Sequence, residues 1–342
     1  MGISVSIVRA IVHELSRYGI ALEQLFEEIG VDPGVVRNST GRLSIDESRK
    51  LVGKAIELTE MPDLGLRLGA TAPIGALQLL GPMLESAPSV RQAVALYQRY
   101  GALLVDGSKI ELIEGSPYSS IRYLAHSMSR GGMLARFAAE AAIVFMSRIG
   151  IALLGPASSP RVARFQHARP DCDAAYRAVL GCDVEFGCRA NELVFDSSFL
   201  DTPSLNLDEA LCALLETRAD GLLSSLTEAT TLEQRVADLL ALEVELSELD
   251  VNVVAARLGL GARTLQRRLG EEGSSWSSIL EAEQKKRACS ALSDTSMPIK
   301  ELAFHVGFSE PSAFHRAFKR WTGTTPNEFR RTRRASRPPT AS

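Results

Sequence analysis

The chain has 342 residues, of which 45% are hydrophobic and 23% charged, so it is long enough to bury a core in each of two domains. Its formal net charge of −3 excludes a chain that is basic throughout, yet the charges are unevenly distributed. Residues 248–342 carry 16 Lys and Arg against 10 Asp and Glu, whereas residues 1–247 carry 22 against 31. An acidic domain joined to a basic one accounts for this balance.

The first hundred residues have the apolar periodicity of helices. Apolar residues recur at helical spacing over residues 3–29. Ser44 and Glu47 have the spacing of a capping box, which predicts a helix that runs to Thr59. Residues 74–87 are expected to be partly helical, and a further helix is expected over 90–100.

Alternating apolar and polar residues then predict strands. Residues 108–114 and 119–124 are expected to pair around a turn, with short strands at 161–165, 184–186 and 192–195. Helices are expected at 132–149 and 173–180. The predicted fold class is α+β: a mixed α/β N-terminal domain over residues 1–205, followed by an all-α C-terminal domain.

Leucines recur near helical spacing from Leu207 to Leu226, which predicts a helical linker over residues 206–230. This helix can pair with its counterpart in a second copy, or pack on its own domain, and periodicity does not decide between the two. Thr231 is expected to cap the first helix of the C-terminal domain, residues 231–330. The remaining residues, 331–342, are basic and predicted to be a disordered tail.

Two helix-turn-helix units are predicted in the C-terminal domain, at residues 251–273 and 299–323. In each unit the second helix buries an apolar pair four residues apart, Leu265 with Leu269 and Phe314 with Phe318. The polar side chains left on the outer faces of these two helices are Arg263, Gln266, Arg267, Ser312, His315, Arg316 and Lys319. A helix fits the DNA major groove, where Arg can bond to guanine and Gln to adenine. A solvated charged face is the alternative for one helical hairpin, but two units in tandem favour DNA reading.

The segments LGLGARTLQRRLGEEG and GFSEPSAFHRAFKRWTGTTPNEFR resemble the DNA-binding domain of AraC/XylS-type transcriptional regulators, and the match covers about 80 residues. The resemblance implies a homodimer with two recognition helices in successive major grooves of double-stranded promoter DNA, in contact with RNA polymerase if it is an activator. The implied base-reading residues are Arg263, Gln266, Arg267, Ser312, His315 and Arg316. The implied phosphate contacts are Thr264, Arg268 and Lys319. Pro311, at another base-reading position, has no polar side chain, so the second helix is expected to read fewer bases.

The N-terminal half resembles the arabinose-binding-like domain found ahead of many such DNA readers, over roughly residues 20–205 and most specifically from Arg164 to Pro203. The resemblance implies a domain that binds a small-molecule effector of unknown identity and that dimerises. Ligand sites combine apolar walls with a few polar groups. The candidate ligand-binding residues are Tyr97, Arg99, Tyr100, Arg136 and Phe137.

An enzyme, or a thiol or metal sensor, is the alternative for the N-terminal domain, and a ligand-independent dimeric regulator is a third. The candidate bases are His13, His126 and His167, but no catalytic motif accompanies them. Cys172, Cys182 and Cys188 lie near one another without the spacing of a compact zinc site. We therefore expect no catalytic residue, no cofactor and no bound metal.

The five cysteines include no CxxC pair, which favours a reduced, cytoplasmic protein, associated with the bacterial nucleoid when it is bound to DNA. No segment is predicted to span a membrane.

Overall fold

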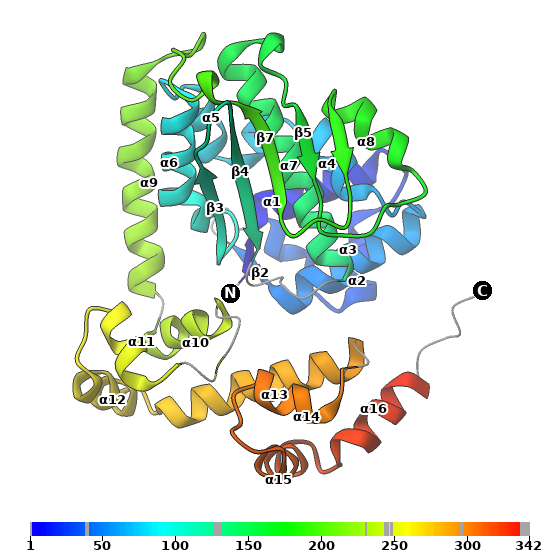
Figure 1. Ribbon diagram of the computed structural model, residues 1–342, viewed down its shortest axis with the longest axis vertical. Helices are drawn as coiled ribbons and strands as arrows, with labels where there is room; N and C mark the ends of the chain where they lie inside the picture. The colour runs from blue at the N-terminus through cyan, green and yellow to red at the C-terminus, as the bar shows by residue number, and fades with distance from the viewer. Residues whose placement is uncertain are drawn as a thin grey trace. The chain divides into compact units, whose positions relative to one another are not determined.

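The computed structural model describes residues 2–37, 41–125, 132–229, 231–242, 246, 249–294 and 297–335. By its internal contacts the chain divides into two compact units, Met1–Thr227 and Glu228–Ser342. The first unit combines helices with β-sheet, and the second is helical in the part that the structure describes. The predicted α+β fold class is therefore confirmed (Figure 1).

The predicted helices and strands of the first unit are present close to their expected bounds. Its helices are α1 (Val5–Ser16), α2 (Leu22–Ile29), α3 (Ile45–Thr59), α4 (Leu64–Thr71), α5 (Leu80–Glu85), α6 (Val90–Tyr100), α7 (Met133–Leu154), α8 (Asp173–Leu180) and α9 (Glu209–Ala229). Its strands are β1 (Gly2–Ser4), β2 (Arg42–Ser44), β3 (Ser108–Ile113), β4 (Tyr118–Ala125), β5 (Val162–Arg164), β6 (Asp183–Glu185) and β7 (Asn191–Asp196). The capping box between Ser44 and Glu47 is formed at the start of α3.

The main sheet has five strands in the order β3-β4-β7-β5-β6. Neighbours run antiparallel except β5 and β6, which are parallel and are connected through α8. Because successive side chains of a strand point to opposite faces, one face buries Ile110, Ile121, Tyr123, Leu193 and Phe195. α7 packs against β4 and β7, and α4 packs against α7, so the core lies between the sheet and these helices (Figure 1).

The other face of the sheet carries a ladder of alternating charges. Arg122 on β4 pairs with Glu192 on β7 at 2.8 Å, and Arg164 on β5 reaches Glu192 at 2.9 Å and Glu185 on β6 at 2.7 Å. Burial raises the pKa of Glu192, but hydrogen bonds from Arg122 and Arg164 outweigh it and leave that pKa below its usual value. Opposite charges on neighbouring strands stabilise their pairing, so the ladder holds the four strands in register.

α7 is longer than the helix predicted over residues 132–149. Its 22 residues are long and apolar enough to cross a bilayer by length and composition, although no such segment was predicted. In this fold α7 is a core helix that packs against α3, α4 and the sheet and buries Glu140 completely. Gly65 on α4 allows the close helix crossing, because a Cβ there would lie 2.3 Å from the carbonyl oxygen of Phe137.

The pairing of β1 with β2 was not predicted. These strands have three residues each, too few for alternation to be recognised, and they meet with Ile3 opposite Leu43. Arg42 anchors the pair through an ion pair with Asp106 at 2.8 Å and a hydrogen bond to the carbonyl of Leu103 at 3.0 Å.

The second unit contains the two predicted helix-turn-helix units, formed by α11 with α12 and by α14 with α15. Its helices are α10 (Leu232–Leu242), α11 (Val251–Arg257), α12 (Ala262–Glu271), α13 (Trp276–Asp294), α14 (Ile299–His305), α15 (Pro311–Thr322) and α16 (Pro326–Ala335). Each helix-turn-helix has its own core, centred on Leu265 and Leu269 in the first and on Phe314 and Phe318 in the second, all fully buried.

α13 belongs to both cores, because it places Ile279 in the first and Leu292 in the second. Arg287, buried on the same helix, pairs with Glu283 at 2.6 Å and donates a hydrogen bond to the carbonyl of Leu240 on α10. The two helix-turn-helix units are therefore joined by a helix that is itself held in place by both of them.

Two acidic side chains tie further elements to this frame. Glu272, at the end of α12, accepts hydrogen bonds from the backbone N–H groups of Leu232 and Glu233 at 2.9 Å each, which caps α10. Glu281 on α13 pairs with Arg320 of α15 at 2.6 Å and accepts a hydrogen bond from the indole of Trp321. α12 and α15 are thus fixed on the same scaffold.

The expected linker, residues 206–230, contains the helix α9, and the expected tail differs in part from its prediction. All of α9 except its last two residues belongs to the first unit. Residues 331–335, expected in the disordered tail, complete α16, whose start is stabilised by reciprocal hydrogen bonds between Thr325 and Glu328. Thr231 accepts the backbone N–H of Gln234 at 3.1 Å, as expected of a cap on α10.

Candidate functional site

α12 presents one apolar and one basic face. Leu265 and Leu269 hold it against its core, and this leaves Arg263, Gln266 and Arg267 exposed on the opposite side. The two residues of this helix that are expected to contact phosphate differ in exposure: Arg268 is exposed and Thr264 is half-buried. The three expected base-reading residues of α12 therefore share one solvent-facing surface.

Arg267 forms an ion pair with Glu271 one turn further along α12. Both side chains are more than half exposed, so water screens the pair and its contribution to stability is small. A guanidinium held this loosely can exchange the carboxylate for a base edge at little cost.

α15 has the same construction. Phe314, Ala317 and Phe318 are buried, while Ser312, Arg316 and Lys319 are exposed. His315 is half-buried, with its ring 6.1 Å from that of Phe314, and Ser312 donates a hydrogen bond to Glu310 at 3.1 Å. Pro311 is the first residue of the helix. Arg316 and Lys319 are thus the long basic side chains that this helix offers to a partner.

The turn before α15 depends on a glycine. Gly307 has a φ of +91°, and a Cβ at this position would lie 3.1 Å from the side chain of Leu246. Both the backbone conformation and the close approach require the absence of a side chain. This turn sets the direction in which α15 leaves α14.

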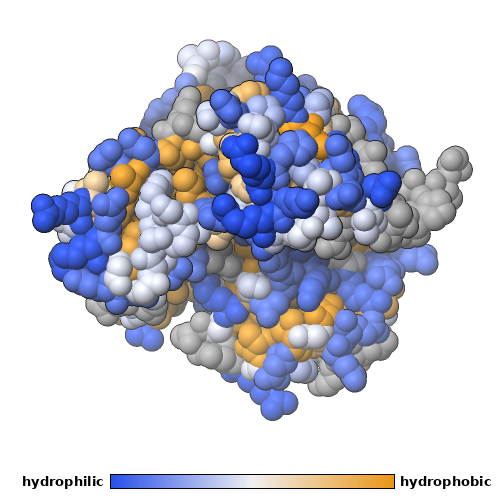
Figure 2. All heavy atoms as spheres, turned by 90° about the horizontal axis from the view of Figure 1, so that it is seen from below, coloured by the Kyte–Doolittle hydropathy of each residue, from blue (hydrophilic) through white to orange (hydrophobic). Residues whose placement is uncertain are grey.

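α12 and α15 are labelled in Figure 1, and Figure 2 is seen from below that view. Hydrophilic side chains project from the surface seen there, with hydrophobic patches between them. The arginines of α12 and α15 belong to the 16 Lys and Arg of residues 248–342, the part of the second unit in which positive charge is in surplus.

The first unit contains a cavity of about 160 Å³ between α6, α7 and the inner face of the sheet. Its walls are formed mainly by aliphatic and aromatic side chains, including Ile7, Leu84, Val94, Ile110, Ile121, Leu134, Ala138, Ala142, Phe145, Leu193 and Phe195. None of the described residues that line it is charged. An engineered apolar cavity of about 150 Å³ takes up benzene, so this volume suffices for a small apolar molecule.

The cavity contains two of the five residues expected at a ligand site, Tyr97 and Phe137. The Tyr97 hydroxyl lies 2.9 Å from the Ser108 hydroxyl. Tyr123 also lines the cavity but was not among the candidates. The sequence contained a signal for Tyr123, because it lies two residues after Ile121 and so on the same, inward face of a predicted strand.

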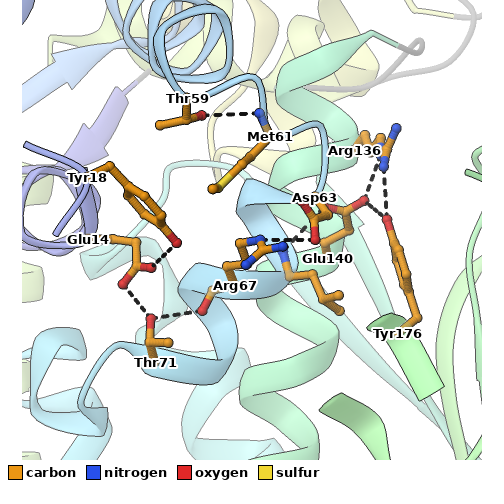
Figure 3. Close-up of polar contacts among 11 residues, drawn as sticks. Glu14, Tyr18, Thr59, Met61, Asp63, Arg67, Thr71, Arg136, Glu140 and Tyr176 are labelled. Carbon is orange, nitrogen blue, oxygen red and sulfur yellow. Dashed lines mark hydrogen bonds and ion pairs between the residues drawn. The ribbon is translucent and has the colours of Figure 1, made fainter. Parts of the chain in front are cut away.

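Arg136 lies outside the cavity lining, in a polar cluster that joins α4, α7 and α8 (Figure 3). Its guanidinium pairs with Glu140 at 2.7 Å and donates to the Tyr176 hydroxyl at 3.0 Å, and Tyr176 in turn donates to Glu140. The backbone N–H of Leu66 donates to Glu140 at 3.3 Å. Burial raises the pKa of Glu140, while these donors act in the opposite direction. Arg136 is thus paired with this buried carboxylate and is not among the residues that line the cavity.

Arg99 and Tyr100 also lie outside the cavity lining, because they contact α9. The Tyr100 hydroxyl donates to Asp220 at 2.8 Å, and Arg99 pairs with the same carboxylate at 2.8 Å. Burial, followed by the hydrogen bond to Asp220, raises the pKa of Tyr100 to about 12. α6 therefore touches the cavity through Tyr97 and touches α9 through the end of the same helix.

α9 packs on the first unit through one side only. Cys212 and Ala219 are buried, whereas Leu207, Leu211 and Leu214 are 46%, 37% and 67% exposed. Leu211 and Leu214 are three residues apart on α9 and so lie on the same side of this helix, and Leu207 lies in the segment that precedes it. α9 therefore packs on its own domain, which is one of the two arrangements that its periodicity allowed. It also leaves exposed leucines, which a second copy of the chain could cover.

In the part of the chain that the structure describes, no group of three His, Cys, Asp or Glu side chains that could hold a metal ion occurs. Burial raises the pKa of Cys182 to about 11 and raises that of Cys172, which disfavours the reactive thiolate. His167 lies 3.5 Å from Glu140, and burial lowers the pKa of its imidazole. His126 lies outside the described residues.

Two family models match the chain. The arabinose-binding N-terminal domain of AraC transcription regulators matches residues 19–204, and a helix-turn-helix domain matches residues 254–332. Together they cover both structural units, and the first alone covers more than half of the chain.

Curated relatives align over nearly the whole length. The chain is 29% identical over 329 residues to the Ornithine utilization regulator of Pseudomonas aeruginosa, covering 96% of both chains. It is 28% identical over 301 residues to the HTH-type transcriptional regulator VirS of Mycobacterium tuberculosis, covering 88% of both. Among solved structures, the regulator CdpR of Pseudomonas aeruginosa matches 91% of this chain and 96% of its own, with 22% identity and a TM-score of 0.42.

Proposed function

Because the chain belongs to the AraC transcription regulators with an arabinose-binding N-terminal domain, we propose that it is a ligand-responsive regulator that reads promoter DNA with α12 and α15. Its relatives over nearly the full length are transcriptional regulators, and it is a regulator rather than an enzyme. In this proposal the two helices enter successive major grooves on one face of the DNA.

The observation that carries the proposal is the pair of basic helices on one scaffold. Each of α12 and α15 buries an apolar pair four residues apart and exposes arginines, and each is tied to α13 or α10 through Glu281 or Glu272. A reader whose two helices are held in this way favours DNA sequences with two half-sites at a set spacing.

Selection of binding sequences from random double-stranded DNA tests this proposal. We expect the full chain to enrich a site with two conserved blocks about 10–10.5 base pairs apart, one helical turn of DNA. The chain with Arg263→Ala should lose the block that α12 reads and keep the other. Enrichment of no sequence, or of a single block unaffected by Arg263→Ala, would contradict reading by two helices.

We further propose that the cavity between α6, α7 and the sheet holds the effector. The cavity is apolar, its volume suits a small molecule, and α6 connects it to α9, which leads to the second unit. An effector with different affinities for two arrangements of the chain would shift the balance between them and so change DNA binding.

A homodimer through α9 is the partner arrangement that the exposed leucines favour. Replacing Leu214 by Asp should weaken self-association at least tenfold, because a charge would be buried in the apolar contact. Ser224→Asp is the matched control, since Ser224 is exposed on another flank of α9. Sedimentation velocity over a concentration series measures both variants. Equal self-association of both would remove α9 from the interface.

We place the protein in the bacterial cytoplasm, on the nucleoid when it is bound to DNA, where RNA polymerase would be its partner if it activates transcription. A ligand-independent dimeric regulator is the second candidate, favoured by the exposed leucines of α9, which allow a dimer whether or not the cavity is filled. An absence of effector binding at the cavity would favour this alternative.

A further inference from the structure

The walls of the cavity indicate what kind of molecule it takes. We propose that the effector is an uncharged, largely apolar molecule with one hydrogen-bonding group, which is held toward Tyr97 and Tyr123. This inference rests on the proposed function, because it takes the cavity to be the effector site. It concerns the chemical class of the ligand, which membership of the family does not specify.

The size and lining of the cavity favour a ligand that is mostly hydrocarbon. Val94 of α6, Ala138 and Ala142 of α7, and Leu193 and Phe195 of β7 all line it. Apolar surface that leaves water for such a wall is stabilised by the hydrophobic effect and by close packing. The small side chains of Ala138 and Ala142 leave room for a ligand along α7.

The basic side chains around the cavity are engaged elsewhere. Arg136 pairs with Glu140, and Arg99 pairs with Asp220. Arg148 on α7 donates to the carbonyl oxygens of residues 69 and 72 at 2.7 and 2.6 Å. A carboxylate or an ammonium group held against these walls would lose hydration without gaining a partner of opposite charge, and that penalty disfavours tight binding of either.

Two tyrosine hydroxyls supply the polar contact. The Tyr97 hydroxyl lies 2.9 Å from the Ser108 hydroxyl, and the Tyr123 hydroxyl also forms a hydrogen bond with Ser108. Burial raises the pKa of both tyrosines, so the hydroxyls remain protonated and neutral. A phenolic hydroxyl both donates and accepts, which matches an alcohol, carbonyl or amide group of a ligand.

Calorimetric titration of the full chain with probes of similar size tests the inference. The probes are 1-octanol, toluene, octanoate and octylamine, the last two charged at neutral pH. We expect 1-octanol and toluene to bind saturably at one site. Octanoate and octylamine should bind at least 100-fold more weakly, because each carries an uncompensated charge into the cavity.

Three variants and one control test whether the probes bind in this cavity. Tyr97→Phe removes the hydroxyl and keeps the ring, so it should weaken 1-octanol about three- to tenfold and leave toluene unchanged. Tyr118→Phe, at an exposed tyrosine outside the cavity, is the matched control. Ala138→Leu and, independently, Ala142→Leu fill the cavity and should weaken both neutral probes at least tenfold. Two filling variants are used so that poor folding of one does not remove the test.

Octanoate binding as tightly as 1-octanol would overturn the uncharged class. Binding by none of the probes, or equal binding in the filled variants that fold, would overturn the cavity as an apolar ligand site. Selection of DNA sequences by the same chain is measured separately. Failure of this inference therefore leaves DNA reading intact, and failure of DNA reading leaves the probe measurements interpretable.

Discussion

Arg267→Ala should weaken binding to the selected operator by about 1–3 kcal/mol, about 5- to 150-fold, and change binding to random DNA little. The loss is selective because a bidentate contact to a base edge exists only on the correct sequence. Fluorescence anisotropy of labelled operator and of a scrambled duplex, at one fixed salt concentration, measures both affinities.

Lys319→Ala provides the contrast on α15. A phosphate contact carries no sequence information, so this variant should weaken operator and scrambled DNA alike. The slope of log K against log salt should fall by about 1. Lys109→Ala, exposed on β3 of the first unit, should change neither quantity. An equal loss on both duplexes for Arg267→Ala would remove the base-reading role that we propose for this residue.

Arg136→Met should destabilise the first unit by about 3 kcal/mol, because it leaves the completely buried Glu140 without its positive partner. Adding Glu140→Gln should recover most of this loss. The amide has no charge. Its oxygen can still accept from the N–H of Leu66, and its NH2 group, which replaces the other oxygen, can donate to the hydroxyl oxygen of Tyr176. Arg169→Met, which removes an exposed ion pair with Asp173, should cost at most about 1 kcal/mol.

The two units can be followed separately in this experiment. Both tryptophans, Trp276 and Trp321, lie in the second unit, so their fluorescence reports its unfolding. Calorimetry of the full chain reports both units. We expect Arg136→Met to lower the transition of the first unit only. A shift of the tryptophan transition by the same amount would show that the effect is not local to the Glu140 cluster.

The loss in Arg136→Met should also depend on pH. Burial raises the pKa of Glu140, and removing Arg136 removes a partner that lowers it, so this pKa rises further. A carboxyl group with a raised folded-state pKa contributes stability below its unfolded-state pKa and loses that contribution as pH rises through the folded-state value. The variant should therefore be closest to the parent in acid and furthest from it in alkali. A loss of constant size between pH 5 and pH 8 would exclude this explanation.

The candidate DNA interface was predicted in detail because its determinants are local. Leu265, Leu269, Phe314 and Phe318 are spaced by one helical turn, so periodicity alone indicates which side of each helix is buried. Once the buried side is known, the exposed side follows, and Arg263, Gln266 and Arg316 are exposed as expected. That these residues read bases remains a proposal that the DNA measurements test.

The candidate ligand site could be predicted only in part. Tyr97 and Phe137 line the cavity, but Arg99 and Arg136, equally plausible from their types, are paired with Asp220 and Glu140. Arg136 and Glu140 are one turn apart, so their pairing was accessible to sequence reasoning. Arg99 meets its partner 121 positions away in the chain, and no local pattern signals such a contact.

By itself the sequence determined the class of fold, most of the longer helices and strands and the two faces of α12 and α15, because these depend on spacing within one segment. Only the tertiary structure decided that α9 packs on the first unit, that β1 pairs with β2, and that no charged residue is among those that line the cavity. These features depend on contacts between distant segments: α9 against α6, strand against strand, and α7 against α4 and the sheet. Periodicity shows which side of an element is buried, but not which other element covers it.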